Sequence, residues 1–577
     1  MPPVRPALAE LTAQHNPSAS TATRYRIRSG TRRLTKATKI PCAPVARVRL
    51  LILTGLILVP AALAAAAGAS TTQQSAVYDN RLLLEDTPQL DLSLLILRRM
   101  GVERVQADLD WAALAPSSRS RKAPRGFDAS NPAAYPAAIW APYDRLVTEA
   151  RRYGLGVTFE IGGPAPRWAT GRSPSPERLA NVWYPSASRF GAFVAAVSAR
   201  YDGNYVPAPG AVPLPAVDTW SVWEQPNSGG SLAPQVVKGV EVAPSIYRAL
   251  AGAAYRALRS DGHRRDTILV GGLDASGQPH PGAAGSTDPL RFVRALFCVD
   301  ARGSRLQGKP ATLRGCPATS TASRTFRSAN PALFGAAGWA ERPYYDRVSP
   351  DQSVAATHPD WVTFADLPEL ERVLDRLEAA YGSHHRLEID VSAYGFNTNP
   401  PQSNDSIGLG LQAAYLNQAE YEAWGDRRIR TITQYLLTDT SPDGSATKLT
   451  ASGLLFATGK PKPALGAYML PVWIPNRTVA RGASQEVWGC IRPADFTIAD
   501  IHAPMTAQIQ FRPGSSGQFL WIGSATVRTS RSCYFDIHLQ FPESGTVRLA
   551  YTFPPGDPTV PAGTTIYSRA VRIALAY

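Results

Sequence analysis

The sequence Thr219-Trp220-Ser221-Val222-Trp223-Glu224-Gln225-Pro226-Asn227 is typical of a short buried strand that ends in polar side chains. From about residue 74 to residue 475, apolar strands of this kind alternate with amphipathic helices. The alternation indicates parallel α/β architecture, and its length favours a closed (β/α)8 barrel, the TIM barrel, over an open sheet. Functional sites of such barrels lie at the C-terminal ends of the strands, so residues 224–227 are the first candidate site.

Other predicted strands end in similar groups of aromatic, proline and polar residues. The strand at 387–391 leads into Ser392-Ala393-Tyr394-Gly395-Phe396-Asn397-Thr398-Asn399-Pro400-Pro401. Three more strand ends carry Asp110-Trp111, Gly163-Pro164-Ala165-Pro166-Arg167-Trp168 and Arg342-Pro343-Tyr344. Together these segments predict one rim of the barrel rich in rings and hydrogen-bonding groups.

In this order, the motifs resemble those of the retaining glycosidases of clan A, and the resemblance extends over most of the barrel. That family carries one catalytic Glu on the fourth strand and one on the seventh. The first motif is similar to the family's Trp-Asn-Glu-Pro-Asn, so Gln225 takes the general acid/base position and Glu224 that of the Asn that binds the sugar 2-hydroxyl. The second motif places Ala393 at the nucleophile position.

The resemblance therefore implies the barrel fold of these glycosidases without their hydrolytic activity. A retaining glycosidase needs two carboxyl groups about 5 Å apart, and neither an amide nor a methyl group can replace one. Two further positions depart from the family: Gln106 stands where an Arg is common, and Glu341-Arg342 where His-His is common. We expect a catalytically inactive protein that binds a carbohydrate, such as a cell-envelope glycan, or a protein partner at the barrel cleft.

Two alternatives stay open. The protein could be an active O-glycosyl hydrolase that uses Glu224 and a relocated second carboxylate. Asp390 is a poor candidate for that second group, because a regular strand places it roughly 10 Å from the nucleophile position and on the other face. We expect it to be a barrel-interior or an ion-paired residue. The other alternative is a cell-envelope scaffold that uses the C-terminal region and leaves the cleft unoccupied.

Aromatic and polar side chains at the strand ends are the predicted substrate-binding set, with the rings acting as stacking faces for sugars. They are Trp111, Trp168, Trp223, Asn227, Arg342, Tyr344 and Tyr394. Trp220 lies in mid-strand and is predicted to be core. Glu160, which ends the third strand, fits a salt bridge at least as well as a ligand contact.

The net charge of +15 is concentrated at the N-terminus. Residues 1–49 carry ten Lys/Arg against one acidic residue, whereas the remaining residues carry only +6. This distribution argues against a nucleic-acid partner. The basic region precedes an apolar segment at 50–70 with an Ala-x-Ala-like end, which predicts a signal peptide cleaved near Ala69 or, alternatively, a retained membrane anchor. Either way the protein is expected outside the cytoplasm, secreted or anchored.

Residues 476–577 lack helical periodicity and contain short alternating segments typical of an all-β sandwich. We expect this accessory domain to be separable, with few contacts to the barrel. Export predicts disulfides Cys298–Cys316 and Cys490–Cys533, leaving Cys42 as a free thiol. No Cys/His spacing fits a metal site, so no metal or other cofactor is expected.

Overall fold

A computed structural model describes residues 70, 72–85, 89–260, 262–345, 347–402, 404–440, 451–530 and 532–576. The basic region 1–49, the apolar segment up to Ala69 and Cys42 lie outside the described residues. No helix of the described part is long and apolar enough to span a membrane.

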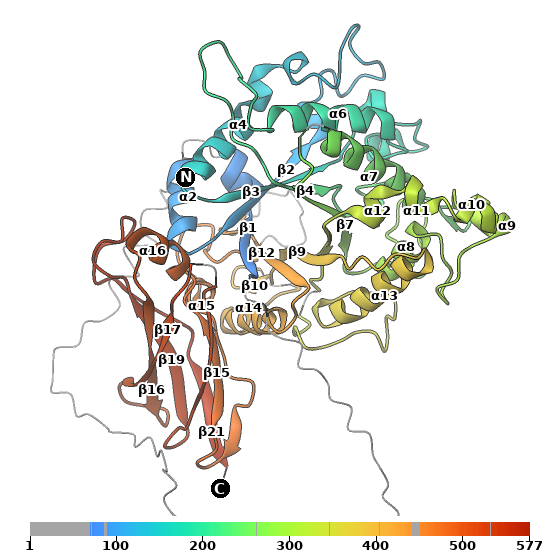
Figure 1. The fold of residues 1–577 in the computed structure, drawn as a ribbon. Coiled ribbons are helices and arrows are strands. Elements are labelled where there is room, and N and C mark those ends of the chain that lie inside the picture. Colours follow the sequence, from blue (N-terminus) through green and yellow to red (C-terminus); the bar gives the residue numbers. More distant parts are fainter. Residues whose placement is uncertain are drawn as a thin grey trace, which may run out of the picture.

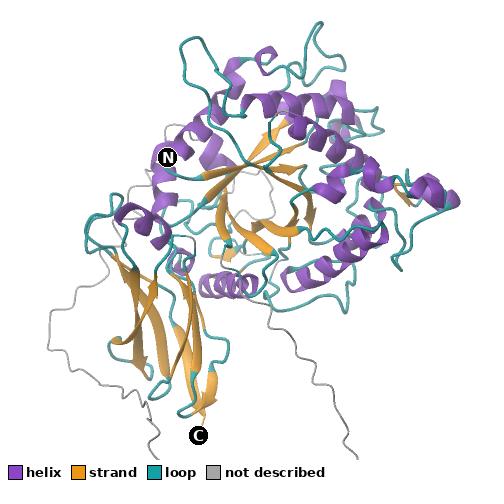
Figure 2. Cartoon of the chain, in the orientation of Figure 1, coloured by secondary structure: helices purple, strands orange, loops and turns teal. Residues whose placement is uncertain are grey.

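Eight parallel strands close into a barrel that is ringed by helices (Figures 1 and 2). Around the barrel they are β1 (Gln74–Tyr78), β2 (Arg104–Asp110), β3 (Gly156–Gly162), β4 (Thr219–Val222), β7 (Thr267–Asp274), β8 (Gly338–Arg342), β9 (Glu388–Tyr394) and β12 (Ile429–Tyr435), and β12 pairs with β1. This architecture confirms the predicted (β/α)8 barrel.

Each barrel strand is followed by a helix that packs on the outside. In chain order the helices are α2 (Leu90–Arg99), α4 (Ala137–Arg152), α6 (Ala187–Arg200), α7 (Ala243–Ser260), α8 (Pro289–Leu296), α13 (Leu367–Ala380), α14 (Leu409–Trp424) and α15 (Pro463–Met469). In α13, the apolar stripe of Leu370, Leu374 and Leu377 is buried, and Gly382 just beyond its end has a φ of +69°, a conformation that favours glycine.

Shorter elements occupy the loops. They are α3 (Trp111–Leu114), α5 (Pro176–Leu179), α9 (Gly308–Leu313), α10 (Ser320–Ser323), α11 (Phe326–Ala329), α12 (Pro331–Gly335), the single turns Arg81–Glu85, Pro132–Ala134, Arg167–Ala169 and Phe364–Asp366, and the strand pairs β5 (Val236–Val237) with β6 (Val240–Glu241) and β10 (Thr398–Asn399) with β11 (Ile407–Gly408).

The C-terminal part contains two β-sheets, which confirms the predicted all-β region. One sheet has the order β13 (Val472–Trp473), β15 (Gln485–Cys490), β18 (Tyr534–Leu539). The other has the order β14 (Thr478–Ala480), β21 (Val571–Ala576), β19 (Gly545–Thr552), β16 (Met505–Pro513), β17 (Leu520–Val527), with β20 (Thr565–Tyr567) paired to β19. The helix α16 (Ala494–Ile501) between β15 and β16 was not predicted.

Buried charged contacts join the sheets to the barrel. Arg492 donates two hydrogen bonds to Glu420 on α14, at 2.6 and 2.5 Å, and Tyr534 donates to Glu420 and to Gln73. The apolar core is also continuous, because buried residues of both parts belong to one cluster. The expectation that few contacts cross the boundary is therefore wrong: β15 and α16 lie directly against the helices that flank β1 and β12 (Figure 1).

Both predicted disulfides are present. Cys298 is bonded to Cys316 in the segment between α8 and β8, and Cys490 at the end of β15 is bonded to Cys533. Disulfides of this kind are typical of extracytoplasmic proteins.

Candidate functional site

The C-terminal ends of the barrel strands meet around one buried cation, Arg342 at the end of β8. Its Nη1 donates to Glu224 Oε1 at 2.6 Å, and its Nη2 donates to Glu160 Oε2 at 2.5 Å. Gln106 also donates to Glu160 Oε2, at 3.3 Å. Side-chain exposure is 4% for Arg342 and 1% for Glu160, but 35% for Glu224. Glu224 is thus the solvent-facing carboxylate of the network.

A third carboxyl group, Asp108 on β2, lies beside this network. The Tyr78 hydroxyl donates to Asp108 Oδ2 at 2.5 Å, and Asn80 Nδ2 donates to the same oxygen at 2.6 Å. The Arg342 guanidinium lies 5.5 Å from the centre of the Tyr78 ring, which connects the two groups. Strands β1, β2, β3, β4 and β8 therefore all contribute to one polar centre.

Burial and nearby negative charges raise the pKa of two acids of this centre, Asp108 and Glu160. Burial raises the pKa of Asp108 well above its usual range, and repulsion from Glu224 and Glu160 adds to the rise. Burial raises the pKa of Glu160 to about 7, while the neighbouring Arg342 opposes it. Burial alone would lower the pKa of Arg342, but Glu160 and Glu224 together raise it well above its ordinary value. Arg342 is therefore charged at any physiological pH.

The backbone that presents Glu224 and Gln225 is tightly held. Trp223 and Gln225 have φ values of +68° and +45°, in the left-handed region that is unusual for such residues. Gln225 N donates to Gly272 O at 2.9 Å, and Ser231 Oγ donates to Glu224 O. The Gln225 amide extends toward Asp274 at the end of β7, with 3.5 Å between Nε2 and Oδ1. Both polar side chains of the motif are thus directed toward the barrel mouth.

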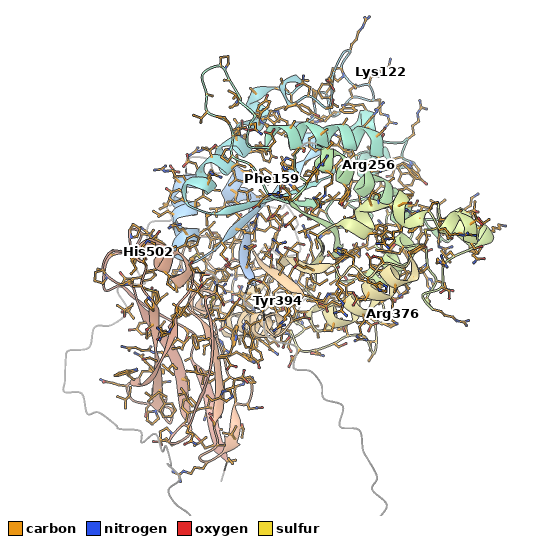
Figure 3. The ribbon with its side chains drawn as sticks, in the orientation of Figure 1. Lys122, Phe159, Arg256, Arg376, Tyr394 and His502 are labelled. Carbon is orange, nitrogen blue, oxygen red and sulfur yellow. A yellow bond between two sulfur atoms is a disulfide. The ribbon has the colours of Figure 1, made fainter. Side chains whose placement is uncertain are left out.

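The seventh strand differs from a regular strand just before its end. Val391 pairs with Ile432 but Tyr394 pairs with Gln434, so three residues of β9 oppose two of β12 in a bulge. Tyr394 packs outward against Phe364, with 4.9 Å between ring centres (its place on the barrel wall is seen in Figure 3). The preceding residue, Ala393, lies within this bulge and is buried.

Asp390 also belongs to the barrel interior, as predicted. It is 6% exposed, and burial raises its pKa to about 6, while a hydrogen bond from Thr431 and the charges of Arg430 and Arg104 oppose the rise. The bulge removes the regular alternation on which its assignment to the opposite face from Ala393 rested.

The rings predicted as stacking faces are mostly buried. Trp111 and Trp223 have no exposed surface; both contact Phe190 of α6, at 5.4 and 5.1 Å between ring centres. Trp168 is 5% exposed and donates its indole N–H to Pro116 O. A ring with no free face cannot stack on a sugar, so this prediction is wrong for these residues and for Tyr394, which is 2% exposed. Trp220 is core, as predicted.

Asn227 has a structural rather than a ligand-facing role. It is fully buried, its amide donates to Asp274 O and Thr287 O, and its oxygen accepts from Asp274 N. All its hydrogen-bonding groups are used to join the loops after β4 and β7. Arg342 and Tyr344 do lie at the mouth: burial raises the pKa of the half-buried Tyr344 phenol, and the nearby charge of Asp274 adds to the rise.

Sequence reasoning missed an aromatic pair on the rim. Tyr345 is 39% exposed and lies 5.1 Å from Trp361 between ring centres, and Trp361 stacks on His358 at 3.8 Å. The Trp361 indole donates to Asp288 Oδ1 at 3.0 Å, which fixes its orientation. Tyr345 directly follows the predicted Tyr344, but Trp361 lies in a long loop with no periodicity to mark it. Asp108 was also missed, because a single Asp in an apolar strand carries no motif.

No group of three or more His, Cys, Asp or Glu residues in the described part of the chain could hold a metal ion. The centre is thus a polar surface of carboxyl, amide, guanidinium and phenol groups. It can exchange hydrogen bonds with a hydroxyl-rich ligand, and it places one carboxyl group of high pKa beside an exposed carboxylate.

No protein-family model and no curated protein matches the sequence. Among solved structures, the chain is similar to a calcium-binding mutant of Bacteroides uniformis beta-glucuronidase 2, with 12% identity over 88% of this chain and 46% of that one, and a TM-score of 0.37. The endo-beta-1,4-mannanase from Thermotoga petrophila has 10% identity over 88% and 98%, with a TM-score of 0.36.

The virulence factor SghA from Agrobacterium tumefaciens has 12% identity over 68% of this chain and 94% of its own, with a TM-score of 0.42. The present chain spans less than half the length of the glucuronidase. Likeness at this level does not indicate what this chain binds or does.

Proposed function

We propose that this chain is an extracytoplasmic, glycosidase-like protein that binds a glycan at the barrel mouth and does not hydrolyse it. The observation that carries the proposal is the ion pairing of Arg342 with both Glu160 and Glu224. One guanidinium is shared by the two Glu side chains of the mouth, while Gln225 and Ala393 align with the positions at which the family that the sequence resembles has its catalytic carboxyl groups.

A glycosidase must protonate the leaving oxygen with one carboxyl group and act on the anomeric carbon with the other. Glu224 accepts a charge-assisted hydrogen bond from Arg342, so one of its carboxylate oxygens is already engaged by the protein. The amide of Gln225 cannot cycle a proton at neutral pH. The same groups are well suited to hold sugar hydroxyls as hydrogen-bond acceptors and donors.

The rim supports a carbohydrate rather than an apolar ligand. Tyr345 and Trp361 offer partly exposed rings, and the mouth beside them contains Tyr344, Glu224 and Gln225. Sugars bind where the C–H face of a ring stacks on an aromatic side chain and the hydroxyls find polar partners. We further propose export through the apolar segment at 50–70, by cleavage near Ala69 or as an anchor, which the two disulfides support.

Binding and turnover should be measured on the same purified protein. Calorimetry against a panel of neutral oligosaccharides is expected to find a ligand, and a panel of aryl and natural glycosides to show no turnover above background. Trp361→Ala should weaken binding about tenfold. Trp521→Ala is the matched control, because Trp521 is 66% exposed on β17, outside the barrel. An equal loss of sugar affinity in the two variants, or the absence of any sugar ligand, would contradict the proposal.

A second function, glycoside hydrolysis, is favoured by one observation: the raised pKa of Asp108 beside the exposed Glu224. Asp108 has a strongly raised pKa and Glu224 is the exposed carboxylate beside it, a combination used by acid/base pairs. If the purified protein hydrolyses a glycoside, Asp108→Asn and Glu224→Gln should each abolish the activity.

A further inference from the structure

The segment between α8 and β8, residues 297–337, forms a basic insertion at the end of the barrel opposite the mouth. It contains α9, α10, α11 and α12, which project from the barrel (Figure 1). Between Cys298 and Ala336 it holds six basic residues and one acidic residue, Asp300. That is +5 of the net +6 that residues 50–577 carry. The positive charge beyond the first 49 residues is thus concentrated in this insertion.

Most of these cations have no carboxylate partner. Of Arg302, Arg305, Lys309, Arg314, Arg324 and Arg327, only Arg314 forms an ion pair within the described part of the chain, with Glu241. Arg327 donates to the backbone oxygen of Gly382 at 2.8 Å, and it lies near enough to Glu378 to act on that carboxyl group, although the two form no direct ion pair among the described residues. The side chain of Arg324 forms no hydrogen bond or ion pair among the described residues. The local field therefore favours an anion.

A groove of about 370 Å³ opens on this insertion. It is lined by Tyr255 of α7 and by Arg324, Arg327, Ser328, Pro331, Phe334 and Gly335. The Tyr255 hydroxyl donates to Gly335 O at 2.9 Å, and a Cβ at residue 335 would lie 2.9 Å from that hydroxyl. Glycine thus allows the phenol to lie directly against the backbone of the groove. Its volume is within the range of small-ligand sites.

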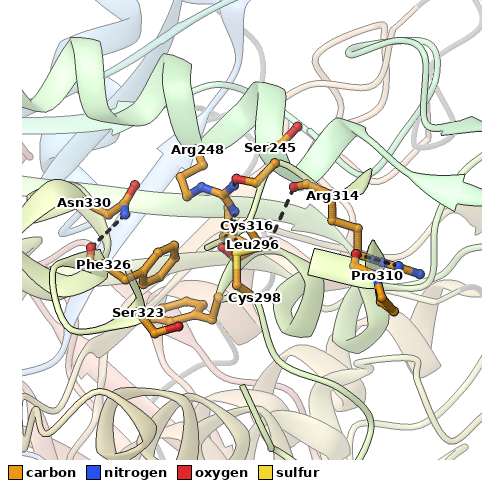
Figure 4. The surroundings of a disulfide bond; sticks show 12 residues. Ser245, Arg248, Leu296, Cys298, Pro310, Arg314, Cys316, Ser323, Phe326 and Asn330 are labelled. Carbon is orange, nitrogen blue, oxygen red and sulfur yellow. Dashed lines mark hydrogen bonds between the residues drawn. A yellow bond between two sulfur atoms is a disulfide. The ribbon is translucent and has the colours of Figure 1, made fainter. Parts of the chain in front are cut away.

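The insertion is cross-linked by the disulfide Cys298–Cys316 and by hydrogen bonds around it (Figure 4). Arg248 on α7 donates to Leu296 O at 2.8 Å and to Gly315 O at 2.7 Å, on either side of the disulfide. Asn330 donates to Phe326 O at 2.8 Å, which joins α11 to the start of α12. The groove arginines are therefore carried by a fixed frame, and a ligand does not have to order it.

We propose that this groove binds an acidic polysaccharide through the carboxylates of its uronic acid residues. Arg324 and Arg327 supply guanidinium forks for carboxylates, and Ser328 and Tyr255 supply hydroxyl groups for the neutral positions of the sugar. The site goes beyond the function proposed for the mouth and does not depend on it.

Two other polyanions fit less well. The insertion exposes only one large apolar side chain among its described residues, Leu313, so it offers little to a lipid bilayer. A nucleic acid would need stacking faces for its bases, but Phe334 is 8% exposed and Arg259 lies over the Tyr255 ring at 5.2 Å.

The test is calorimetry of the full-length protein with an oligogalacturonate, and with a neutral maltooligosaccharide of the same length. Binding of the acidic sugar alone is expected, weakened as salt rises from about 0.1 to about 1 M. Arg324→Gln with Arg327→Gln should lower the affinity at least about tenfold. Arg302→Gln with Lys309→Gln removes the same charge from the same insertion outside the groove, and should cost less than about threefold.

Several results would overturn the proposal. Equal losses in the two double variants would mean general charge attraction, and equal binding of the neutral sugar would mean that the arginines do not select an acid. Phosphatidylglycerol vesicles and single-stranded DNA are tested in parallel, and tighter binding of either that is lost with Arg324 and Arg327 would replace the polysaccharide. Thermal unfolding verifies that each variant is folded. Trp361→Ala should leave this binding unchanged, which separates it from the mouth.

Discussion

Arg342 and Glu224 lie 118 residues apart in the sequence and meet across the barrel mouth, with 2.6 Å between Nη1 and Oε1. The same guanidinium binds Glu160, so a single side chain sets the charge of two acids. This relationship holds the carboxylate groups of the mouth in place as hydrogen-bond acceptors. Removal of the Arg342 side chain should therefore change stability in a pH-dependent way.

Arg342→Met should destabilise the fold by about 3–5 kcal/mol, because it leaves buried charges without a partner. The loss should depend on pH. Glu160 has a folded pKa of about 7, above its unfolded value, so its contribution to the free energy of unfolding falls as pH rises between those values. Without Arg342 this pKa rises further. Urea unfolding should therefore show a larger loss at pH 8 than at pH 5.

The matched control is Arg376→Met, which removes a surface ion pair with Glu369 in which Arg376 is 65% exposed. It should cost less than about 1 kcal/mol at either pH. A loss from Arg342→Met that does not change with pH would contradict the assigned role of Glu160.

Carboxyl groups introduced at the two expected catalytic positions should make the protein hydrolyse glycosides. Gln225→Glu with Ala393→Glu and Glu224→Asn is expected to give detectable glycoside hydrolysis in a sensitive fluorogenic assay. Either new carboxyl group alone should give little, because the pair acts as a unit. Glu224→Asn alone is the control for loss of the ion pair. A folded triple variant that binds sugar but turns over no substrate would show that the two positions are not the family's catalytic ones.

Asp495 on α16 should make stability fall as pH rises from the unfolded pKa of an Asp to about 8. Burial raises its pKa to about 8, repulsion from Glu103 adds to the rise, and Arg492 opposes it. The folded protein therefore holds this proton up to about pH 8, and the free energy of unfolding falls from the unfolded pKa up to that value. Asp495→Asn should gain about 2–5 kcal/mol relative to the wild type between pH 5 and pH 9. Chemical unfolding at pH 5 and pH 9 measures this gain, and Glu85→Gln, at an exposed position, is the control. An equal change in the free energy of unfolding with pH for Asp495→Asn and the wild type would refute the assignment.

The joint between barrel and sheets should resist separation. Glu420→Gln leaves the buried Arg492 without its carboxylate and should cost about 3–5 kcal/mol. Glu388→Gln, in a pair with Arg430 that is exposed on both sides, should cost less than about 1 kcal/mol.

A chain ending at residue 475 should fail to fold as a soluble monomer, since it would expose the face of α14 and the core that the sheets cover. Circular dichroism and size-exclusion chromatography check this. A monomeric, cooperatively unfolding fragment would restore the simpler prediction of two separable units.

The sequence predicted the elements well because burial imposes a period on each strand and helix. The stripe on α13 and the segment 485–491 are visible without a structure. The directions of side chains at strand ends were not predictable in the same way. Trp111 and Trp223 looked like stacking faces, but α6 supplies Phe190 to cover them.

Other features could not be predicted for the same reason, because they depend on contacts between distant segments. No local pattern marks the bulge between Val391 and Tyr394, and none shows that Arg342 would pair with Glu160 and Glu224. The disulfides were predictable because two cysteines stand within each region and export constrains the choice.

All barrel strands run in one direction, so the chain enters β1 at the end opposite the mouth. Ser70 is fixed there, with its backbone N–H bonded to Trp424 O at the end of α14. The basic insertion begins at that same end, after α8. If the segment before Ser70 tethers the protein to a surface, that tether and the insertion with Arg324 and Arg327 leave the barrel at the same end, and the mouth with Glu224 lies at the other end.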